Sequence, residues 1–126
     1  MKAASFDYQR PATLKDALRA LVDGGGAAKV MGGGQSLGPM LNLRLTRPKQ
    51  VVDVSALAEL RQVAAEGDQL RIGAAVTHAE IEDGVHPLLR DGLLQSVAGG
   101  IAYRAIRNRG TLGGSLAHAD PAADWV

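Results

Sequence analysis

Two glycine-rich segments carry the residue types that are best suited to ligand binding. The first reads Gly32-Gly33-Gly34-Gln35-Ser36-Leu37, and the second reads Thr111-Leu112-Gly113-Gly114-Ser115. Glycine leaves the backbone bare, so that N–H groups can turn toward a ligand and the ligand can approach closely. Amide and hydroxyl side chains add neutral donors. Two such loops far apart in the sequence predict a ligand with two phosphates, in which each loop grips one end of a pyrophosphate.

Ordinary tight turns are the alternative interpretation of these glycines, and the residues alone leave it open. The common phosphate motifs do not apply. A dinucleotide-binding fingerprint that used Gly32 and Gly34 would require glycine where Leu37 stands, and no Gly-Lys pair of a P-loop occurs in the chain. Any nucleotide site must therefore be built on a different framework.

The chain offers little for acid–base or metal chemistry. It contains no cysteine, which excludes thiolate zinc sites, iron–sulfur clusters and a cysteine nucleophile. We expect His78 to be a solvated residue in the first turn of a helix, and His118 and Asp120 lack a third metal ligand at suitable spacing. Ser36 and Ser115 have no neighbouring histidine to act as a base. We therefore predict neither a catalytic residue nor a metal site.

Charge and composition narrow the class of partner. The net charge is +1, the basic residues are scattered, and aromatic residues make up only 3% of the chain, which argues against nucleic-acid binding. Arg104, Arg107 and Arg109 flank the second loop, either as a solvated basic edge or as groups that offset phosphate charge or dock an acidic partner. No apolar run is long enough to span a membrane, and the lack of cysteine fits a cytoplasmic protein.

Hydrophobic periodicity and cap signals predict the elements that position these loops. A strand, a helix capped by Thr13 and a second strand give a β-α-β order, which favours parallel pairing. Asp53, at the end of a third strand, is expected to be an ordinary strand-end polar residue rather than a hydrogen-bond partner for a loop. The expected elements of this half are strands over 6–9, 27–31 and 50–54, a helix from 14 to the glycines at 24–26, and a short helix near 36–43.

The second half is expected to contain a hairpin and several short helices. The capping box Thr77-His78-Ala79-Glu80 opens one helix. Asp120 caps another helix that begins at Pro121, and the segment before the second glycine loop looks strand-like. The remaining expected elements are a hairpin of 61–65 with 70–74, and a helix that begins at Pro87, carries Leu89, Leu93 and Val97 on one stripe and ends at Gly99-Gly100.

These elements fit an α+β domain that begins with a small β-α-β unit. Too few residues follow Asp120 to complete a helix that can pack against anything. We therefore expect the chain to be the N-terminal part of a longer protein.

Both glycine loops resemble known family motifs. Gly32–Leu37 is similar to the motif Ala/Gly-Gly-Gly-x-Ser, and Ile106–Ser115 is similar to Arg-Asn-x-Gly-Thr-Ile-Gly-Gly-Asn/Ser. Ala119–Asp124 matches the residues that follow the second motif. These are motifs of the FAD-binding (medium) subunits of molybdenum hydroxylases such as aerobic carbon monoxide dehydrogenases, which are related to the flavin domain of xanthine dehydrogenase. The resemblance covers the whole chain in order and spacing.

The resemblance implies FAD as the cofactor and a flavin fold of the vanillyl-alcohol-oxidase or PCMH type. It also implies a small α/β subdomain over 1–55 and the start of a second, larger subdomain over 56–126. In that family the two loops hold the pyrophosphate, and by position Thr111 and Ser115 donate to phosphate oxygens. Asp124 reaches the ribityl or ribose hydroxyls, with a first-turn helix residue as the alternative. The residues implied as FAD-binding are Gly32, Gly33, Gly34, Gln35, Ser36, Leu37, Thr111, Leu112, Gly113, Gly114, Ser115 and Asp124.

The resemblance also implies an electron-transfer subunit of a molybdenum-containing hydroxylase or dehydrogenase. In such enzymes a molybdopterin-binding large subunit carries out the hydroxylation, and electrons reach FAD through the clusters of a 2Fe-2S small subunit. The expected complex is a dimer of heterotrimers. The absence of cysteine agrees with this, because the clusters must lie on another chain. A stand-alone FAD-dependent oxidase or reductase of the same fold is the alternative function, and a non-enzymatic interaction domain is the third.

Overall fold

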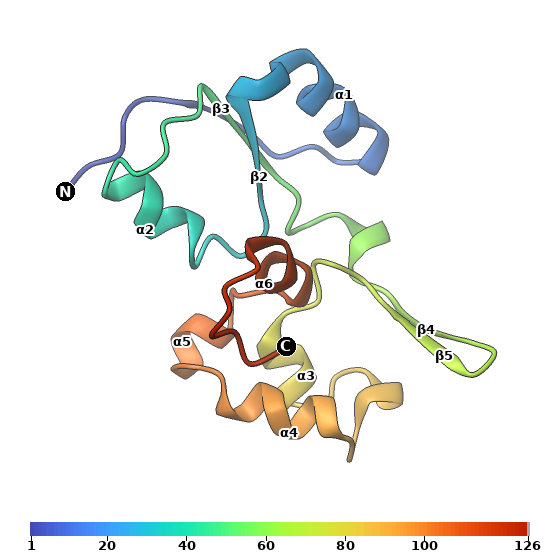
Figure 1. Ribbon diagram of the computed structural model, residues 1–126. Helices are drawn as coiled ribbons and strands as arrows, with labels where there is room; N and C mark the ends of the chain where they lie inside the picture. The colour runs from blue at the N-terminus through green and yellow to red at the C-terminus, as the bar shows by residue number, and fades with distance from the viewer. Residues whose placement is uncertain (126) are drawn as a thin grey trace.

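Three short parallel strands form a sheet in the N-terminal part of the chain (Figure 1). In this computed structural model, which describes residues 1–125, they are β1 (Asp7–Gln9), β2 (Ala28–Met31) and β3 (Gln50–Asp53). The strand order is β1-β3-β2, and the central strand is the most deeply buried. The prediction of parallel pairing is confirmed, although the first two strands each pair with the third rather than with each other.

Helix α1 (Leu14–Gly24) packs against β2 and β3 and closes the first of two apolar cores. Its predicted cap is present, since the Thr13 hydroxyl oxygen accepts a hydrogen bond from the Asp16 N–H at 3.1 Å. The helix ends at Gly25, whose φ of 51° lies in the left-handed region that glycine adopts readily. The buried members of this core are Ala17, Val52 and Leu57.

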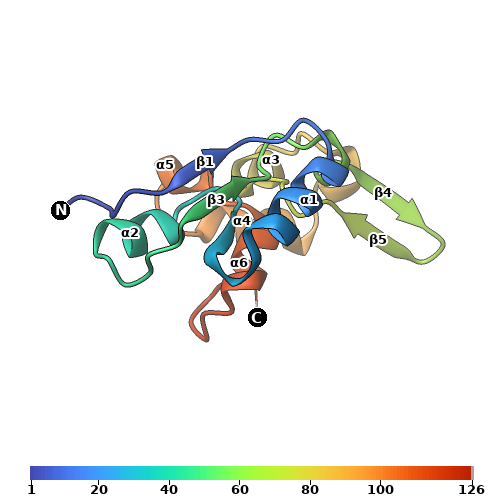
Figure 2. The same cartoon turned by 90° about the horizontal axis from the view of Figure 1, so that it is seen from above.

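An antiparallel hairpin connects the sheet to the second half of the chain, as predicted. β4 (Val63–Glu66) and β5 (Gln69–Ile72) are joined by a tight turn in which Gly67 has a φ of 63°. Figure 1 and Figure 2 both show the hairpin projecting away from the molecule on the side opposite α2 (Leu37–Asn42). Short 3-10 turns complete the connections: η1 (Gly25–Ala27), η2 (Ala58–Leu60) and η3 (Pro87–Leu89).

Four short helices follow the hairpin in the described part of the chain and enclose the second apolar core. Val76 and Ile81 are fully buried at its centre, and Trp125 packs against it from the C-terminal segment. None of the helices within residues 1–125 combines the length and hydropathy that crossing a bilayer requires. The four helices are α3 (His78–Glu82), α4 (Leu93–Gly100), α5 (Arg104–Arg107) and α6 (Leu112–His118).

The single helix predicted over 87–100 is wrong. A break separates η3 from α4, and Asp91 within it has a φ of 55°, which a right-handed helix does not allow. Gln95 holds the break, because its side chain accepts from the Asp91 N–H at 2.7 Å and donates to the Glu82 carbonyl at 2.9 Å. The four-residue repeat therefore spans two elements, and Leu93 is 78% exposed instead of sharing a buried stripe.

Two further predictions about the C-terminal part are wrong. The strand-like segment before the second glycine loop is helix α5. The helix predicted from Pro121 is absent from the described residues, where Asp120 instead organises a single turn. Its carboxylate accepts from the Ala122 N–H at 2.9 Å, and its carbonyl accepts from the Ala123 N–H at 2.9 Å. Aspartate before proline favours such turns as well as helix caps, so the local sequence does not separate the two.

The second glycine loop is locked against the segment that follows the hairpin. The Gly113 N–H donates to the Ala74 carbonyl at 3.0 Å, and the Leu112 N–H donates to the Val76 carbonyl at 3.0 Å. A β-carbon on Gly113 would lie only 2.4 Å from the β-carbon of Ala74. This distance is far below van der Waals contact, so the packing requires a residue without a side chain.

We expect Gly113→Ala to lower the free energy of unfolding by about 1–3 kcal/mol, because the added methyl group overpacks the contact with Ala74. Gly100→Ala is the matched control, since its added β-carbon at the end of α4 meets no atom within 4 Å. That change is neutral or stabilises by up to about 1 kcal/mol. Denaturant unfolding measures both variants, and equal stabilities would contradict the packing argument.

Candidate functional site

A cleft of about 410 Å³ opens at the carboxyl edge of the parallel sheet. Arg10 follows β1, Gly32-Gly33 follows β2 and Ser55 follows β3, so all three strands deliver lining residues to the same edge. Open parallel sheets bind their ligands outside this edge. The second half of the chain supplies the opposite wall. Its lining residues are Arg61, Thr77, Asn108 and Arg109.

The two glycine loops touch each other along this cleft. A β-carbon on Gly33 would lie 1.8 Å from the carbonyl oxygen of Arg109, and one on Gly32 would lie 2.8 Å from the hydroxyl oxygen of Thr111. The absence of side chains is therefore what lets the loops meet. Two segments that are far apart in the sequence present one continuous surface, as a ligand gripped at both ends requires.

The first glycine loop presents free backbone donors. Within residues 1–125, the N–H groups of 33–36 donate to no protein acceptor. Gly34 has a φ of 72°, and the Gln35 side chain donates to a carbonyl of the same loop at 2.9 Å. Ser36 is exposed and makes no capping bond to α2, which begins at Leu37. Consecutive free N–H groups next to a positive-φ glycine form a concave surface suited to an anion.

The second glycine loop uses most of its donors internally. The N–H groups of Leu112 and Gly113 bond to the segment after the hairpin, and the Gly114 N–H donates to the Thr111 hydroxyl oxygen at 3.1 Å. Thr111 is buried and caps α6, and Ser115 lies partly buried in the first turn of that helix. The two glycines thus have a packing role, and the hydroxyl groups of this loop are the donors left for a ligand.

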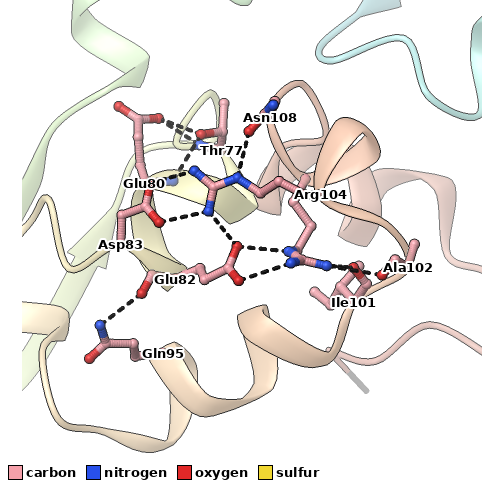
Figure 3. Close-up of polar contacts among 10 residues, drawn as sticks. Thr77, Glu80, Glu82, Asp83, Gln95, Ile101, Ala102, Arg104 and Asn108 are labelled. Carbon is pink, nitrogen blue, oxygen red and sulfur yellow. Dashed lines mark hydrogen bonds and ion pairs between the residues drawn. The ribbon is translucent and has the colours of Figure 1, made fainter.

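Two of the three arginines near the second loop form ion pairs with α3 (Figure 3). Arg107 binds Glu82 through two nitrogen atoms at 2.7 and 2.9 Å. Arg104 binds Asp83 at 2.7 and 2.6 Å and reaches Glu82 at 2.8 Å. These bonds hold the pKa of both carboxyl groups below their ordinary values. The interpretation as a solvated basic edge is wrong for this pair, which ties α5 to α3, whereas Arg109 lines the cleft.

His78 is buried, so the prediction of a solvated histidine is wrong. The backbone N–H of His78 donates to the Gly110 carbonyl at 2.9 Å, next to the second loop. Its Nε2 accepts from the Trp125 indole at 3.2 Å, and Nδ1 has no partner among the described residues. Burial lowers the pKa of the His78 imidazole. The negative charge of Asp124 offsets this lowering only in part. Asp124 itself is exposed and does not line the cleft.

Asp53 is a buried polar centre next to the cleft. The Tyr8 hydroxyl and the Ser55 N–H both donate to its carboxylate, the latter at 2.9 Å, and Nε of Arg10 lies 4.0 Å away. Burial raises the pKa of Asp53, but these hydrogen bonds outweigh burial and bring the pKa below its ordinary value. The expectation of an ordinary strand-end residue is therefore wrong, and the alternative of a loop partner is the correct one.

Sequence reasoning missed most of the residues that line the cleft. Arg10 and Ser55 carried a usable signal, because the residues that follow parallel strands lie at the same edge as the first glycine loop. Arg61 and Thr77 come from the second half of the chain, and no local pattern places them opposite that edge.

Comparison with known proteins identifies the family. Residues 4–126 match the family described as "FAD binding domain in molybdopterin dehydrogenase". The chain belongs to this family. The resemblance predicted from the glycine motifs is confirmed, as are the α+β fold class and FAD as the cofactor.

Members of this FAD-binding family match the chain over nearly its full length. Subunit alpha of the 6-hydroxypseudooxynicotine dehydrogenase complex of Paenarthrobacter nicotinovorans is 44% identical, over 98% of this chain and 42% of the relative. The carbon monoxide dehydrogenase medium chain of Hydrogenophaga pseudoflava is 36% identical, over 94% of this chain and 42% of the relative. A crystal structure of quinoline 2-oxidoreductase from Pseudomonas putida 86 superposes with a TM-score of 0.90 at 40% identity, covering 98% of this chain and 43% of that chain. The chain thus spans less than half the length of these proteins.

We expect the free energy of unfolding to fall as the pH drops below about 6.5. In that range His78 binds a proton in the unfolded chain, whereas in the folded protein its lowered pKa keeps it neutral. Above that pH the contribution of neutral His78 is fully present. His78→Gln should flatten the profile between about pH 7.5 and 5.5, a window above the titration of the carboxyl groups. His118→Gln, at an exposed histidine, is the control and should keep the wild-type slope. Denaturant unfolding across this range measures the slopes, and a His78→Gln slope equal to that of the wild type would contradict the expectation.

Proposed function

We propose that this chain holds FAD between its two glycine loops, as the flavin-binding part of an electron-transfer subunit of a molybdenum hydroxylase complex. The contact between the loops carries the proposal, because it sets the free N–H groups of 33–36 beside the second motif. The proposed fold is of the vanillyl-alcohol-oxidase or PCMH type. Residues 1–55 form its small subdomain, and residues 56–126 begin the larger one.

The donors present fit a pyrophosphate. The N–H groups of 33–36 and the Ser36 hydroxyl donate to one phosphate, and the hydroxyls of Thr111 and Ser115 donate to the other. Hydrogen bonds to charged oxygens are about twice as strong as neutral ones, so neutral donors suffice to hold the group. Asp124 suits the sugar, because a carboxylate accepts from hydroxyl groups and would repel phosphates at close range.

FAD, when bound, supplies the redox chemistry, accepting electrons and delivering them to an external acceptor. This chain binds and orients the cofactor and supplies no catalytic group of its own. Residues 1–126 contain no cysteine, so they cannot themselves hold the iron–sulfur clusters of such a complex. We propose as partners a molybdopterin-binding large subunit and a 2Fe-2S small subunit, in a cytoplasmic dimer of heterotrimers. The names of two relatives, a complex subunit and a medium chain, support an assembly of several chains.

Gly34→Val should abolish FAD retention, because a β-branched residue is strained at a φ of 72° and would redirect the N–H groups of the loop. Gly26→Val is the matched control, since its added β-carbon meets no atom within 4 Å. Flavin absorbance of the purified full-length protein measures retention, and circular dichroism verifies folding. A folded Gly34→Val variant with wild-type flavin content would show that the first loop is only a turn.

The full-length protein should purify together with a chain that carries iron–sulfur clusters, because its flavin needs an electron donor within tunnelling reach. Size-exclusion chromatography of the natively expressed protein, with metal analysis of the peak, tests this. A stable, flavin-loaded monomer would favour a stand-alone FAD-dependent oxidase or reductase instead. A colourless protein that takes up no added FAD would remove the flavin proposal altogether.

A further inference from the structure

Three arginines line the cleft, and they differ in whether a carboxylate of the protein pairs closely with the guanidinium group. The partly exposed Arg61 side chain already has several polar partners within the protein. It forms an ion pair with Glu80 at 2.6 Å, and it donates to the carbonyl oxygens of Ser55 at 3.3 Å and Ala75 at 3.4 Å. Its charge is therefore balanced by a carboxylate that the fold itself provides.

Arg10 and Arg109 are not balanced in this way. Arg10 is 57% exposed on its side chain, and the nearest carboxylate, that of Asp53, lies 4.0 Å away and already accepts from Tyr8. Arg109 is exposed and forms no ion pair with any residue in the described part of the chain, although Arg104 and Arg107 on the preceding helix are both paired. Arg109 thus lines the cleft without an ion pair to any described residue, and Arg10 has only the long pair with Asp53.

Both charges act at the same place. Arg10 follows β1 and Arg109 precedes the second glycine loop, so they approach the cleft from opposite walls. The hydrogen bond to Asp53 raises the pKa of the Tyr8 hydroxyl, and the charges of Arg10 and Arg109 both oppose this rise. Both residues line the same cleft, which places the two positive charges at one site.

Bare backbone lies beside these charges. Gly33 is in contact with the carbonyl group of Arg109, and Gly32-Gly33 lines the cleft between the two arginines. The Arg109 carbonyl fills the side of Gly33 that a β-carbon would occupy, so the arginine side chains are the charged groups left to meet an anion in the cleft.

We propose that Arg10 and Arg109 form a phosphate-binding site in the cleft at the carboxyl edge of the sheet, which Gly32 and Gly33 also line. A phosphate group matches the site because its several oxygens accept from two guanidinium groups at once. The phosphate comes either from the pyrophosphate of FAD, in which case the site rests on the proposed function, or from a free phosphate anion.

FAD titration of the full-length protein, freed of its flavin, tests the first source. Arg109→Gln and Arg10→Gln should each weaken FAD binding by roughly tenfold at low salt, which corresponds to the loss of one charge-assisted hydrogen bond. The loss should shrink at high salt, because salt screens exposed charges. Arg109→Lys should retain the salt dependence. Arg71→Gln, which removes an equal charge from an exposed pair on the hairpin, is the control and should bind FAD as the wild type does.

Inorganic phosphate tests the second source on the same flavin-free protein. Phosphate should raise the melting temperature of the wild type and of Arg71→Gln, but not of Arg109→Gln. Competition between phosphate and FAD would assign the site to the FAD pyrophosphate, and stabilisation without competition would assign it to a free anion. The proposal is overturned if both glutamine variants match the wild type in FAD affinity and in stabilisation by phosphate. A wild-type protein that binds no FAD would instead overturn the proposed function, while the phosphate measurement still decides this site.

Discussion

The contact between the Gly33 backbone and the Arg109 carbonyl is the constraint on which the rest of the structure depends. A β-carbon at Gly33 would lie 1.8 Å from that oxygen, so the two peptide groups meet with no room for a side chain. β2 delivers one partner and α5 delivers the other. The contact therefore fixes the parallel sheet relative to the helices, and it lies beside the cleft, which Gly32, Gly33 and Arg109 line.

Two different kinds of support keep the second loop in place for this contact. On one side, Arg104 and Arg107 form ion pairs with Glu82 at the end of α3 and with Asp83, which directly follows it. Partly exposed ion pairs contribute little to stability, but bidentate hydrogen bonds from arginine to a carboxylate fix the relative orientation of the two groups. On the other side, backbone hydrogen bonds hold the loop: Leu112 donates to Val76, Gly113 donates to Ala74, and His78 donates to Gly110. The ion pairs thus orient α5 on α3, and the hydrogen bonds fix the loop to the segment that follows the hairpin.

Local sequence signals were sufficient wherever a segment decides its own conformation. The capping box at Thr77, the hairpin and the parallel strands were all predictable, and two residues of the first glycine loop, Gly32 and Gly33, line the cleft. The predictions failed where distant segments determine the local structure. Trp125 packs against His78, and the Gln95 side chain, which also bonds to Glu82, holds the interruption of the predicted helix at Asp91. Gly113 shows a third limit, because bare backbone serves close packing as well as ligand binding and the sequence alone does not distinguish them. The arginines of the cleft wall were beyond prediction as a group, since only the fold brings them together.

The projecting hairpin has a practical consequence for anyone who handles this protein. Its two strands pair only with each other, and its turn at Gly67 stands clear of both apolar cores. Exposed turn tips of this kind accept insertions with little effect on folding, and they are also where proteases cut first. The tip is therefore a suitable attachment point for a fluorescent label or an affinity tag, remote from the cleft, and a nick there would leave both halves of the fold held together by their packing.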